Sequence, residues 1–308
     1  MGQFKSIVFL TSIIIACALL KSIYPISEGF NSSSNMYNLP LREFCIFGSA
    51  NTALTNSTKI VSVDQIKDVL DRGCRFIELE IYSVKGMPEV GYSNDSKKYN
   101  LDSENSLALG DVLNKIVSIG FSQAPNANDP IFIHMRIKTS NTNLYNKIAD
   151  IIKTNIEPRV YGGARGNEAM LSTPLSRLMK RVVIIADTDG ENSPDYKDLK
   201  PYIHMESGKY TVRKYKADEL SAGLLEPPNI KDDGRTTDVK LIRIVYSNNS
   251  YNNPDIKKMV PNFGAQIIMN QFYSPDANLT ETERIFRDNK TSFLPISRML
   301  RYLKNDAN

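Results

Sequence analysis

The feature that most constrains the fold is a regular alternation of strand-like and helix-like stretches from Leu41 onward. Short apolar stretches predict strands, and longer stretches with apolar residues at helical spacing predict helices between them. Strands joined through helices pair in parallel, and over roughly 270 residues this predicts a (β/α) barrel more than an open sheet. The expected strands are 43–48, 75–83, 130–137, 182–186, 241–246 and 265–272, and the expected helices include 62–73, 111–119 and 143–156.

The first of these helices has clear boundaries, and the strand after it has a two-sided pattern. Ser62 and Gln65 form a capping box at the start of the helix, and Gly73 closes it in the C′ position. In the strand 75–83, alternate residues face opposite sides. Two carboxylates therefore share one face with aromatic residues, which is unusual for a purely structural strand. That face carries Phe76, Glu78, Glu80 and Tyr82, and the other carries Ile77, Leu79 and Ile81.

An apolar run without charge lies between Lys5 and Lys21. It is short for a membrane-spanning helix, which needs about 20 residues, but it reaches that length if Ser22 to Tyr24 are added and Lys21 snorkels. A cleaved signal peptide is the alternative, although no small-x-small cleavage site follows. We predict a transmembrane signal anchor over 1–24, a flexible tether over 25–40, a barrel over 41–302 and a tail over 303–308, which places the protein at a membrane.

Several smaller features remain open or exclude a class. The start Met-Gly-Gln-Phe-Lys-Ser fits N-myristoylation at Gly2. The net charge of +4 is mild and no basic block with aromatic residues appears, so no nucleic-acid partner is expected. The three cysteines have no disulfide or metal-ligand spacing. N-x-Ser/Thr sequons, which an Asn-rich chain also produces by chance, leave glycosylation open; they begin at Asn31, Asn56, Asn94, Asn248, Asn278 and Asn289.

A series of segments, in order, resembles the phosphoinositide-specific phospholipase C family. Residues 73–80, Gly-Cys-Arg-Phe-Ile-Glu-Leu-Glu, resemble the family's signature strand. Residues 49–54 are similar to its Ser-His-Asn-Thr-Tyr-Leu, 90–93 to its His-Gly-Tyr-Thr, and 130–136 to its Pro-Val-Ile-Leu-x-Leu-Glu. In the second half, 243–249, 262–269 and 290–295 resemble further family segments. The resemblance covers 41–302 and implies a distorted TIM (β/α)8 barrel of the PLC-like phosphodiesterase type, built of X and Y halves, after the predicted transmembrane helix.

The resemblance also shows what the chain has lost. In the family one histidine helps to move the proton of the attacking inositol hydroxyl, and another protonates the leaving diacylglycerol. The first position is Ala50 here and the second is Val90, and neither side chain can transfer a proton. The chain has two histidines. By alternation His134 shares a strand face with Arg136, so it could point into the barrel mouth and substitute for a missing catalytic histidine. A structural role is the favoured interpretation of both His134 and His204.

The family's calcium site is altered as well. Asn51, Glu78 and Glu80 match three of its four ligands, whereas Arg136 replaces the fourth, a Glu. Calcium prefers several oxygen ligands, so a guanidinium in this place opposes it. We therefore expect Arg136 to form a bidentate pair with Glu78 or Glu80, and we expect no cofactor, or calcium only if the family site survives.

Phosphate recognition is eroded too, because 182–189 contains acids where the family has Lys-x-Lys, while the substrate-contacting arginine survives as Arg243. The chain is predicted to be a catalytically inactive phospholipase C-like barrel held at a membrane as a structural or binding component. The alternative is an active phosphoinositide phosphodiesterase with a rewired, calcium-independent site that uses His134 and Arg136. A headgroup binder without turnover would depend on Arg243.

The expected partners are membrane lipid and a phosphoinositide headgroup, and protein partners are left open. The Asn-, Ile- and Lys-rich composition and the anchor-plus-tether beginning are similar to those of membrane proteins of large DNA viruses.

Overall fold

The computed structural model describes residues 36–56, 59–94, 99–139, 141–187, 196–207, 212–222, 241–245 and 252–306. Contacts group residues from Leu39 to Asn308 into one compact unit, which carries the elements below. Within the described ranges, none of the helices is long and apolar enough to cross a membrane. The predicted anchor at 1–24 lies outside the described residues, and so does most of the predicted tether at 25–40.

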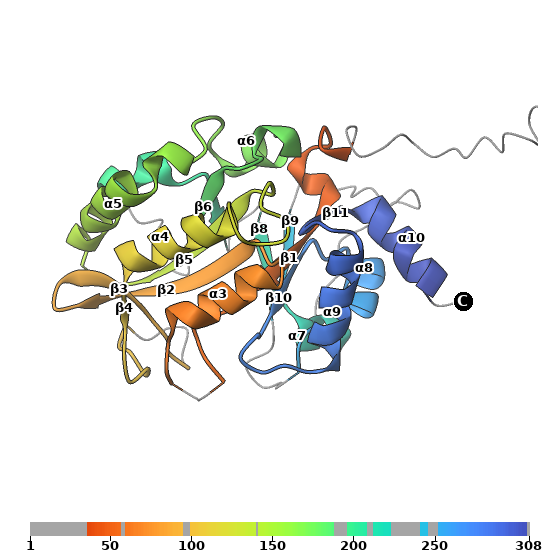
Figure 1. Ribbon diagram of the computed structural model, residues 1–308, viewed down its shortest axis with the longest axis horizontal. Helices are drawn as coiled ribbons and strands as arrows, with labels where there is room; N and C mark the ends of the chain where they lie inside the picture. Colours follow the sequence, from red (N-terminus) through yellow and green to blue (C-terminus); the bar gives the residue numbers. More distant parts are fainter. Residues whose placement is uncertain are drawn as a thin grey trace, which may run out of the picture. The chain divides into compact units, whose positions relative to one another are not determined.

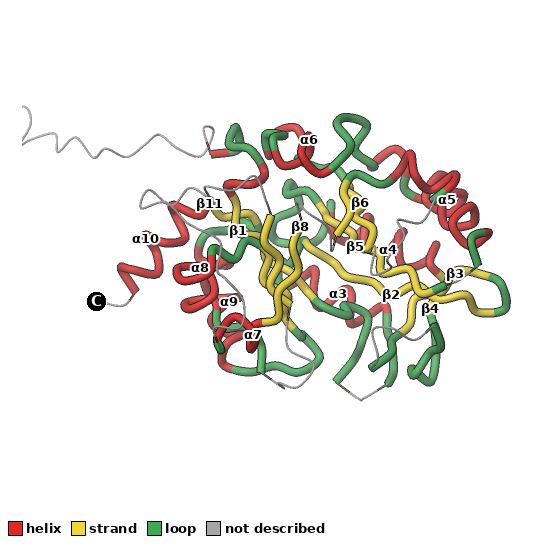
Figure 2. The backbone as a smooth tube through the Cα atoms, turned by 180° about the vertical axis from the view of Figure 1, so that it is seen from behind, coloured by secondary structure: helices red, strands yellow, loops and turns green. Residues whose placement is uncertain are grey.

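Eight parallel strands form one curved sheet in the order β7-β6-β5-β2-β1-β10-β9-β8 (Figure 2). Parallel pairing is what the alternation of strands and helices predicts. Short antiparallel strands extend the sheet, with β3 and β4 beside β2 and β11 beside β1. The parallel strands are β1 (Phe44–Ser49), β2 (Phe76–Val84), β5 (Ile131–Lys138), β6 (Val182–Asp187), β7 (Met205–Ser207), β8 (Val212–Lys216), β9 (Leu241–Val245) and β10 (Ile267–Asn270), and the antiparallel ones are β3 (Met87–Gly91), β4 (Leu107–Ala108) and β11 (Phe293–Pro295).

Helices pack along the outside of this sheet, and α3, α4 and α5 lie in series beside β2 and β5 (Figure 1). The helices are α3 (Val63–Asp71), α4 (Leu109–Gly120), α5 (Asn143–Asn155), α6 (Asn167–Leu171), α7 (Ala217–Ser221), α8 (Ile256–Phe263), α9 (Ala277–Asp288) and α10 (Ile296–Asp306). Four 3-10 helices join them, η1 (Leu41–Glu43), η2 (Glu157–Arg159), η3 (Leu175–Arg177) and η4 (Lys197–Tyr202).

The predicted boundaries of α3 are confirmed. The Ser62 side chain accepts a hydrogen bond from the Asp64 N–H at 3.1 Å, as an N-cap does. After the helix, Gly73 has a φ of +88°, a conformation that a residue without Cβ adopts at no steric cost. The chain therefore leaves the helix and enters β2 where the sequence predicts.

The two faces of β2 also separate as predicted. Ile77, Leu79 and Ile81 point outward and join the hydrophobic core beneath the helices. Phe76 points inward and stacks on Phe132 of β5, with ring centroids 6.2 Å apart. Further along the strand, the inward positions change from aromatic to charged side chains. The barrel interior is therefore layered, with an aromatic layer below a polar one.

The prediction of a closed barrel is corrected by the sheet order. Among the described residues no hydrogen-bonded ladder joins β7 to β8, so the eight strands form an open barrel. β7 is only three residues long. The side-chain amide of Asn167 bonds both backbone groups of Glu206 in β7, at 2.7 and 3.0 Å. These groups are thus satisfied without another strand, which removes one reason for closure.

The stretch Ser207 to Thr237 is polar and poorly periodic, and residues 207 and 212–222 of it lie within the described ranges. This segment contributes β8 and α7, and β8 pairs in parallel with β9 over five residues. Strand pairing depends on backbone groups, so a polar sequence without clear alternation does not exclude it.

Candidate functional site

Five charged or titratable side chains from three neighbouring strands meet in the upper, polar layer of the barrel. Glu78 and Glu80 lie on β2, His134 and Arg136 on β5, and Asp187 at the end of β6. The parallel register places Glu78 beside His134, and Glu80 beside Arg136. Since neighbours in register share a face, the five side chains converge at the carboxyl ends of the strands, where barrel enzymes hold their active sites.

Arg136 lies among three carboxylates. Its Nη1 is 2.8 Å from Glu80 Oε1 and 3.6 Å from Glu78 Oε1, and its Nε is 3.6 Å from Asp187 Oδ2. The sequence predicted a bidentate pair with one glutamate. The guanidinium instead bridges the acids, because a third carboxylate comes from β6.

Glu80 is the most fully bonded of the acids. Besides Arg136, its Oε2 accepts hydrogen bonds from the Tyr82 hydroxyl at 2.8 Å and the Ser93 backbone N–H at 2.9 Å. Burial raises the pKa of Glu80, and the Arg136 charge opposes this rise. Burial also raises the pKa of Tyr82, which keeps its hydroxyl a donor. Both carboxylate oxygens of Glu80 are therefore held by donors from neighbouring residues.

His134 stands between two of the carboxylates. Its Nδ1 is 2.9 Å from Glu78 Oε2, and its Nε2 is 3.6 Å from Asp187 Oδ2. A neutral imidazole has one donor and one acceptor nitrogen, whereas both nitrogens of an imidazolium donate. The Nδ1–Glu78 distance is that of a hydrogen bond, whereas the 3.6 Å between Nε2 and Asp187 is an electrostatic contact only.

The charges of the cluster nearly cancel. Three carboxylates, Glu78, Glu80 and Asp187, face Arg136 and the buried Lys138, whose charge also lowers the pKa of Glu80. Among the described side chains, three carboxylates thus face two cations, and His134 lies 2.9 Å from one of the carboxylates. A buried cluster of ions is tolerated when it is paired in this way.

The cluster is closed to solvent. His134 is 0% exposed and Arg136 is 6% exposed, and the three acids are buried as well. General acid–base catalysis requires the catalytic group to reach the proton that it transfers. His134 has no exposed surface at which a phosphodiester could meet it.

The same geometry tests the family's calcium site, and the residues do not fit the metal. A guanidinium nitrogen, 2.8 Å from Glu80, occupies the space among the oxygens that would bind the ion. A fixed positive charge repels a divalent cation, which needs several anionic oxygens turned toward it. In the described part of the chain, no group of His, Cys, Asp or Glu side chains is arranged to hold a metal ion.

The remaining predicted residues lie around or outside the cluster. Asn51 follows β1 with a φ of +44°, and its neighbour Thr52 exchanges two hydrogen bonds with the Glu78 backbone, at 3.0 and 3.1 Å. Ala50 is buried beside it, with its N–H bonded to the Asn270 carbonyl. Val90 is placed apart, because it pairs with Ile81 and belongs to the hydrophobic core.

Two further predicted residues have different outcomes. Arg243 is a backbone position in β9, in register with Ile267, and its side chain lies outside the described residues. His204 is structural, since its Nδ1 accepts from the Ile184 N–H at 3.0 Å and its Nε2 is 2.7 Å from the Tyr161 carbonyl. Burial lowers the pKa of His204, in keeping with a neutral ring.

Sequence reasoning missed Asp187 and Lys138 as members of the site. Asp187 had been noted only as an acid where the family has a cation. The available signal was its position in the strand. Val183, Ile185 and Asp187 are every second residue of β6, so they share the face that points to the barrel interior.

Comparisons with known proteins agree on the fold. Residues 37–188 match the family model described as phosphatidylinositol-specific phospholipase C, X domain. No curated protein sequence matches the chain.

Among solved structures, PLC21 from L. pealei has a TM-score of 0.63 and 15% identity, covering 85% of this chain and 37% of its own. PLC21 from S. officinalis has a TM-score of 0.62 and 15% identity, covering 85% of this chain and 37% of its own. The phosphatidylinositol-specific phospholipase C from Listeria monocytogenes has a TM-score of 0.49 and 13% identity, covering 81% of this chain and 96% of its own.

The chain thus spans little more than a third of the two PLC21 proteins, and at these identities the likeness to them shows the fold alone. The X-domain match ends at residue 188, just after Asp187, and includes all five members of the cluster. Through residues 37–188, the chain belongs to the phosphatidylinositol-specific phospholipase C family.

Proposed function

We propose that this protein is a catalytically inactive phospholipase C-like domain that serves as a structural or binding component at a membrane. One observation carries the proposal, namely the buried ionic cluster in which Arg136 bridges Glu78, Glu80 and Asp187. The groups that would bind calcium in the family hold an internal cation instead.

The missing proton-transfer groups support the same conclusion. Ala50 and Val90 stand at the two family histidine positions, and Val90 packs in the core. A positioned acid or base contributes about 10²–10⁴-fold to a rate, so the loss of both removes most of the acceleration. The remaining histidine in the cluster holds Glu78 through its Nδ1 at 2.9 Å, and its ring is fully buried.

The test is turnover of labelled phosphatidylinositol in mixed micelles by the full chain, with calcium and with a chelator. We expect no release of inositol phosphate above the protein-free rate in either condition. Release that depends on the protein, and that His134→Ala abolishes while Arg177→Gln does not, would overturn the proposal. Arg177 is the matched control because it is exposed on η3, outside the cluster.

That outcome would establish the second candidate, a calcium-independent phosphodiesterase. The observation that favours it is the carboxylate on each side of His134, since a carboxylate is the usual partner that orients a catalytic imidazole. The complete burial of the ring weighs against it. Turnover in the chelator with loss in Arg136→Met would assign the arginine the role of the metal.

Headgroup binding without turnover is a narrower form of the first proposal. Its support is the retained Arg243 at a family substrate position. We expect titration with inositol 1,4,5-trisphosphate to detect binding to the full chain, and Arg243→Gln to weaken it. Equal binding heats for the unaltered chain and Arg243→Gln would show that Arg243 does not bind the headgroup. Only the structural role would then remain.

A further inference from the structure

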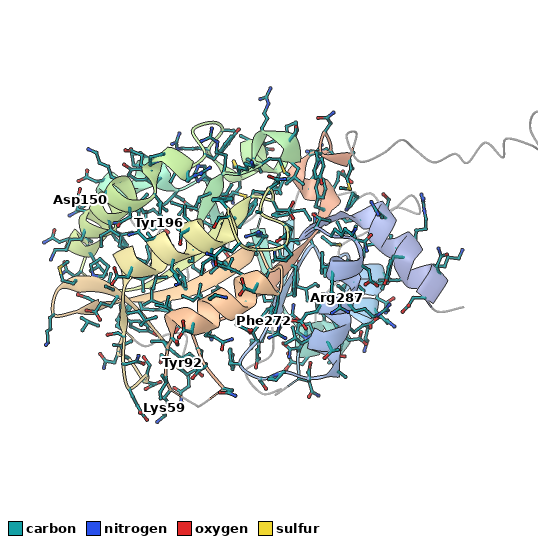
Figure 3. All side chains as sticks on the ribbon, in the orientation of Figure 1. Lys59, Tyr92, Asp150, Tyr196, Phe272 and Arg287 are labelled. Carbon is teal, nitrogen blue, oxygen red and sulfur yellow. The ribbon has the colours of Figure 1, made fainter. Side chains whose placement is uncertain are left out.

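A cavity of about 600 Å³ lies at the end of the strands opposite to the ionic cluster. Its walls come from the end of α3 with Gly73 before β2, the loop with Pro125 and Asn126 before β5, and α9 with the turn that follows it. Figure 3 labels Arg287 on this side of the structure. The volume lies in the range of small-molecule sites, about 300–1,000 Å³.

The charges on the cavity wall are unbalanced. Its two acids have partners, because Asp71 pairs with Lys67, and Glu283 pairs with Arg72. Arg287 and Lys290 also line the cavity, and neither forms an ion pair with a residue in the described ranges. The wall therefore presents two positive charges that attract an anion.

The inner wall is apolar, and the Asn126 side chain adds a buried acceptor to it. Phe286 is buried and stacks on Phe47, with ring centroids 5.1 Å apart, which fixes a flat apolar surface. Asn126 is 9% exposed, and its Nδ2 donates to the Gly73 carbonyl at 2.9 Å and to Asp129 Oδ2 at 3.1 Å. These bonds orient the amide, and its buried Oδ1 accepts no hydrogen bond from the described residues.

We propose that this cavity binds a small organic anion with an apolar ring and a hydrogen-bond donor. The anionic group faces Arg287 and Lys290, the ring packs on Phe286, and the donor satisfies Asn126 Oδ1. An acceptor left unsatisfied in a buried wall discriminates strongly between a ligand that carries a donor and one that does not. The site is separate from the ionic cluster, so it does not depend on catalytic activity.

The first arm of the test varies the ligand on the unaltered full chain, by isothermal titration. Indole-3-acetate is the probe, because it carries a carboxylate, a flat ring and an N–H. We expect indole-3-acetamide, which lacks the charge, and 1-methylindole-3-acetate, which lacks the donor, each to bind at least tenfold more weakly. Equal affinities of the three compounds, or no heat with the probe at millimolar concentration, would overturn the proposal.

The second arm varies the protein. Arg287→Gln with Lys290→Gln should weaken indole-3-acetate at least tenfold, whereas Arg301→Gln with Lys258→Gln should leave its affinity within twofold. The control pair removes the same charge from exposed residues on α10 and α8. Unchanged binding in the first pair contradicts the proposal. Thermal midpoints check the fold of both variants, and the ligand series still decides if one of them fails to fold.

Discussion

The most direct perturbation of the ionic cluster is Arg136→Met, which removes the charge and keeps an unbranched side chain of similar length. Arg136 is buried, with carboxylate oxygens of Glu80, Glu78 and Asp187 at 2.8, 3.6 and 3.6 Å. The substitution leaves three acids against Lys138 and His134. Uncompensated negative charge then remains in a buried site.

The expected cost follows from this geometry. Removing one partner of a buried ion pair destabilises a protein by about 3–5 kcal/mol, because the other charge stays buried. Arg136 serves three acids, so the upper part of that range applies. For a domain of this size each kcal/mol shifts Tm by about 2–4 °C, which gives a loss on the order of 10–20 °C.

The deficit should depend on pH with a definite sign. Burial raises the pKa of Glu80 from its ordinary 4.5, and the Arg136 charge limits that rise, so the variant raises this pKa further. Between the unfolded value and the raised value, the folded state then binds more protons than the unfolded chain. Stability in that window falls as pH rises, so the deficit is largest above the raised pKa and shrinks as pH falls toward the unfolded value.

The assay is urea unfolding of the full chain, followed by far-UV circular dichroism at several pH values. Arg177→Met is the control, since a surface substitution outside any ion pair changes stability by no more than about 0.5 kcal/mol. If Arg136→Met and the control lie within 1 kcal/mol of each other across pH 5–8, Arg136 is not the counter-ion of the cluster. The proposal of an internal cation in the metal's place then fails.

Three further predictions concern other buried charges. Arg136→Glu restores an acid at the family's fourth ligand position, so calcium should stabilise this variant by about 2.7 kcal/mol at 100 times its Kd. In the same calorimetric measurement calcium should leave the stability of the unaltered chain unchanged. Stabilisation of both proteins would contradict the conclusion that the unaltered site does not fit the metal. Burial lowers the pKa of His204, so between pH 6.5 and the folded-state pKa the unfolded chain binds more protons, and stability falls as the pH drops across that window. His204→Gln should remove this acid dependence in pH-jump unfolding. An unchanged slope of unfolding free energy against pH would refute it. Arg75 is fully buried, no described residue hydrogen-bonds its guanidinium nitrogens, and burial lowers its pKa to about 10 while the charge of the buried Asp129 opposes that shift. Arg75→Met removes a poorly solvated cation but also leaves the Asp129 charge without it, so the free energy of unfolding should change by less than about 1 kcal/mol. A 3 kcal/mol loss in urea would show that the interaction with Asp129 dominates.

Periodicity located the strands β1, β2, β5, β6, β9 and β10 and the helices α3, α4 and α5, but it gave no sign of the short strands β3 and β4. The strand predicted at 182–186 is β6, and Ser62 and Gly73 bound α3, because capping and alternation are local properties. In the second half the same approach missed β8 and α7, whose polar sequence carries no clear period. Closure of the barrel could not be inferred either, since it depends on pairing between residues distant in the chain.

The candidate site divides in the same way. Sequence alone placed Glu78 and Glu80 on one face of a strand, and the family resemblance brought Asn51 and Arg136 to them. It could not show that Asp187 completes the charge balance, because β6 reaches β5 only through the register of the sheet. Nor could it show that Val90 turns into the hydrophobic core, which the pairing of β3 with β2 decides.

The sequence by itself determined that residues 50 and 90 are Ala and Val, whose side chains cannot transfer a proton in any fold. Only the tertiary structure decided what became of the groups that remain. Burial removes water, so charges from β2, β5 and β6 must neutralise one another. The resulting order, Arg136 among three acids and His134 between two of them, is a property of three strands in register and of no single segment.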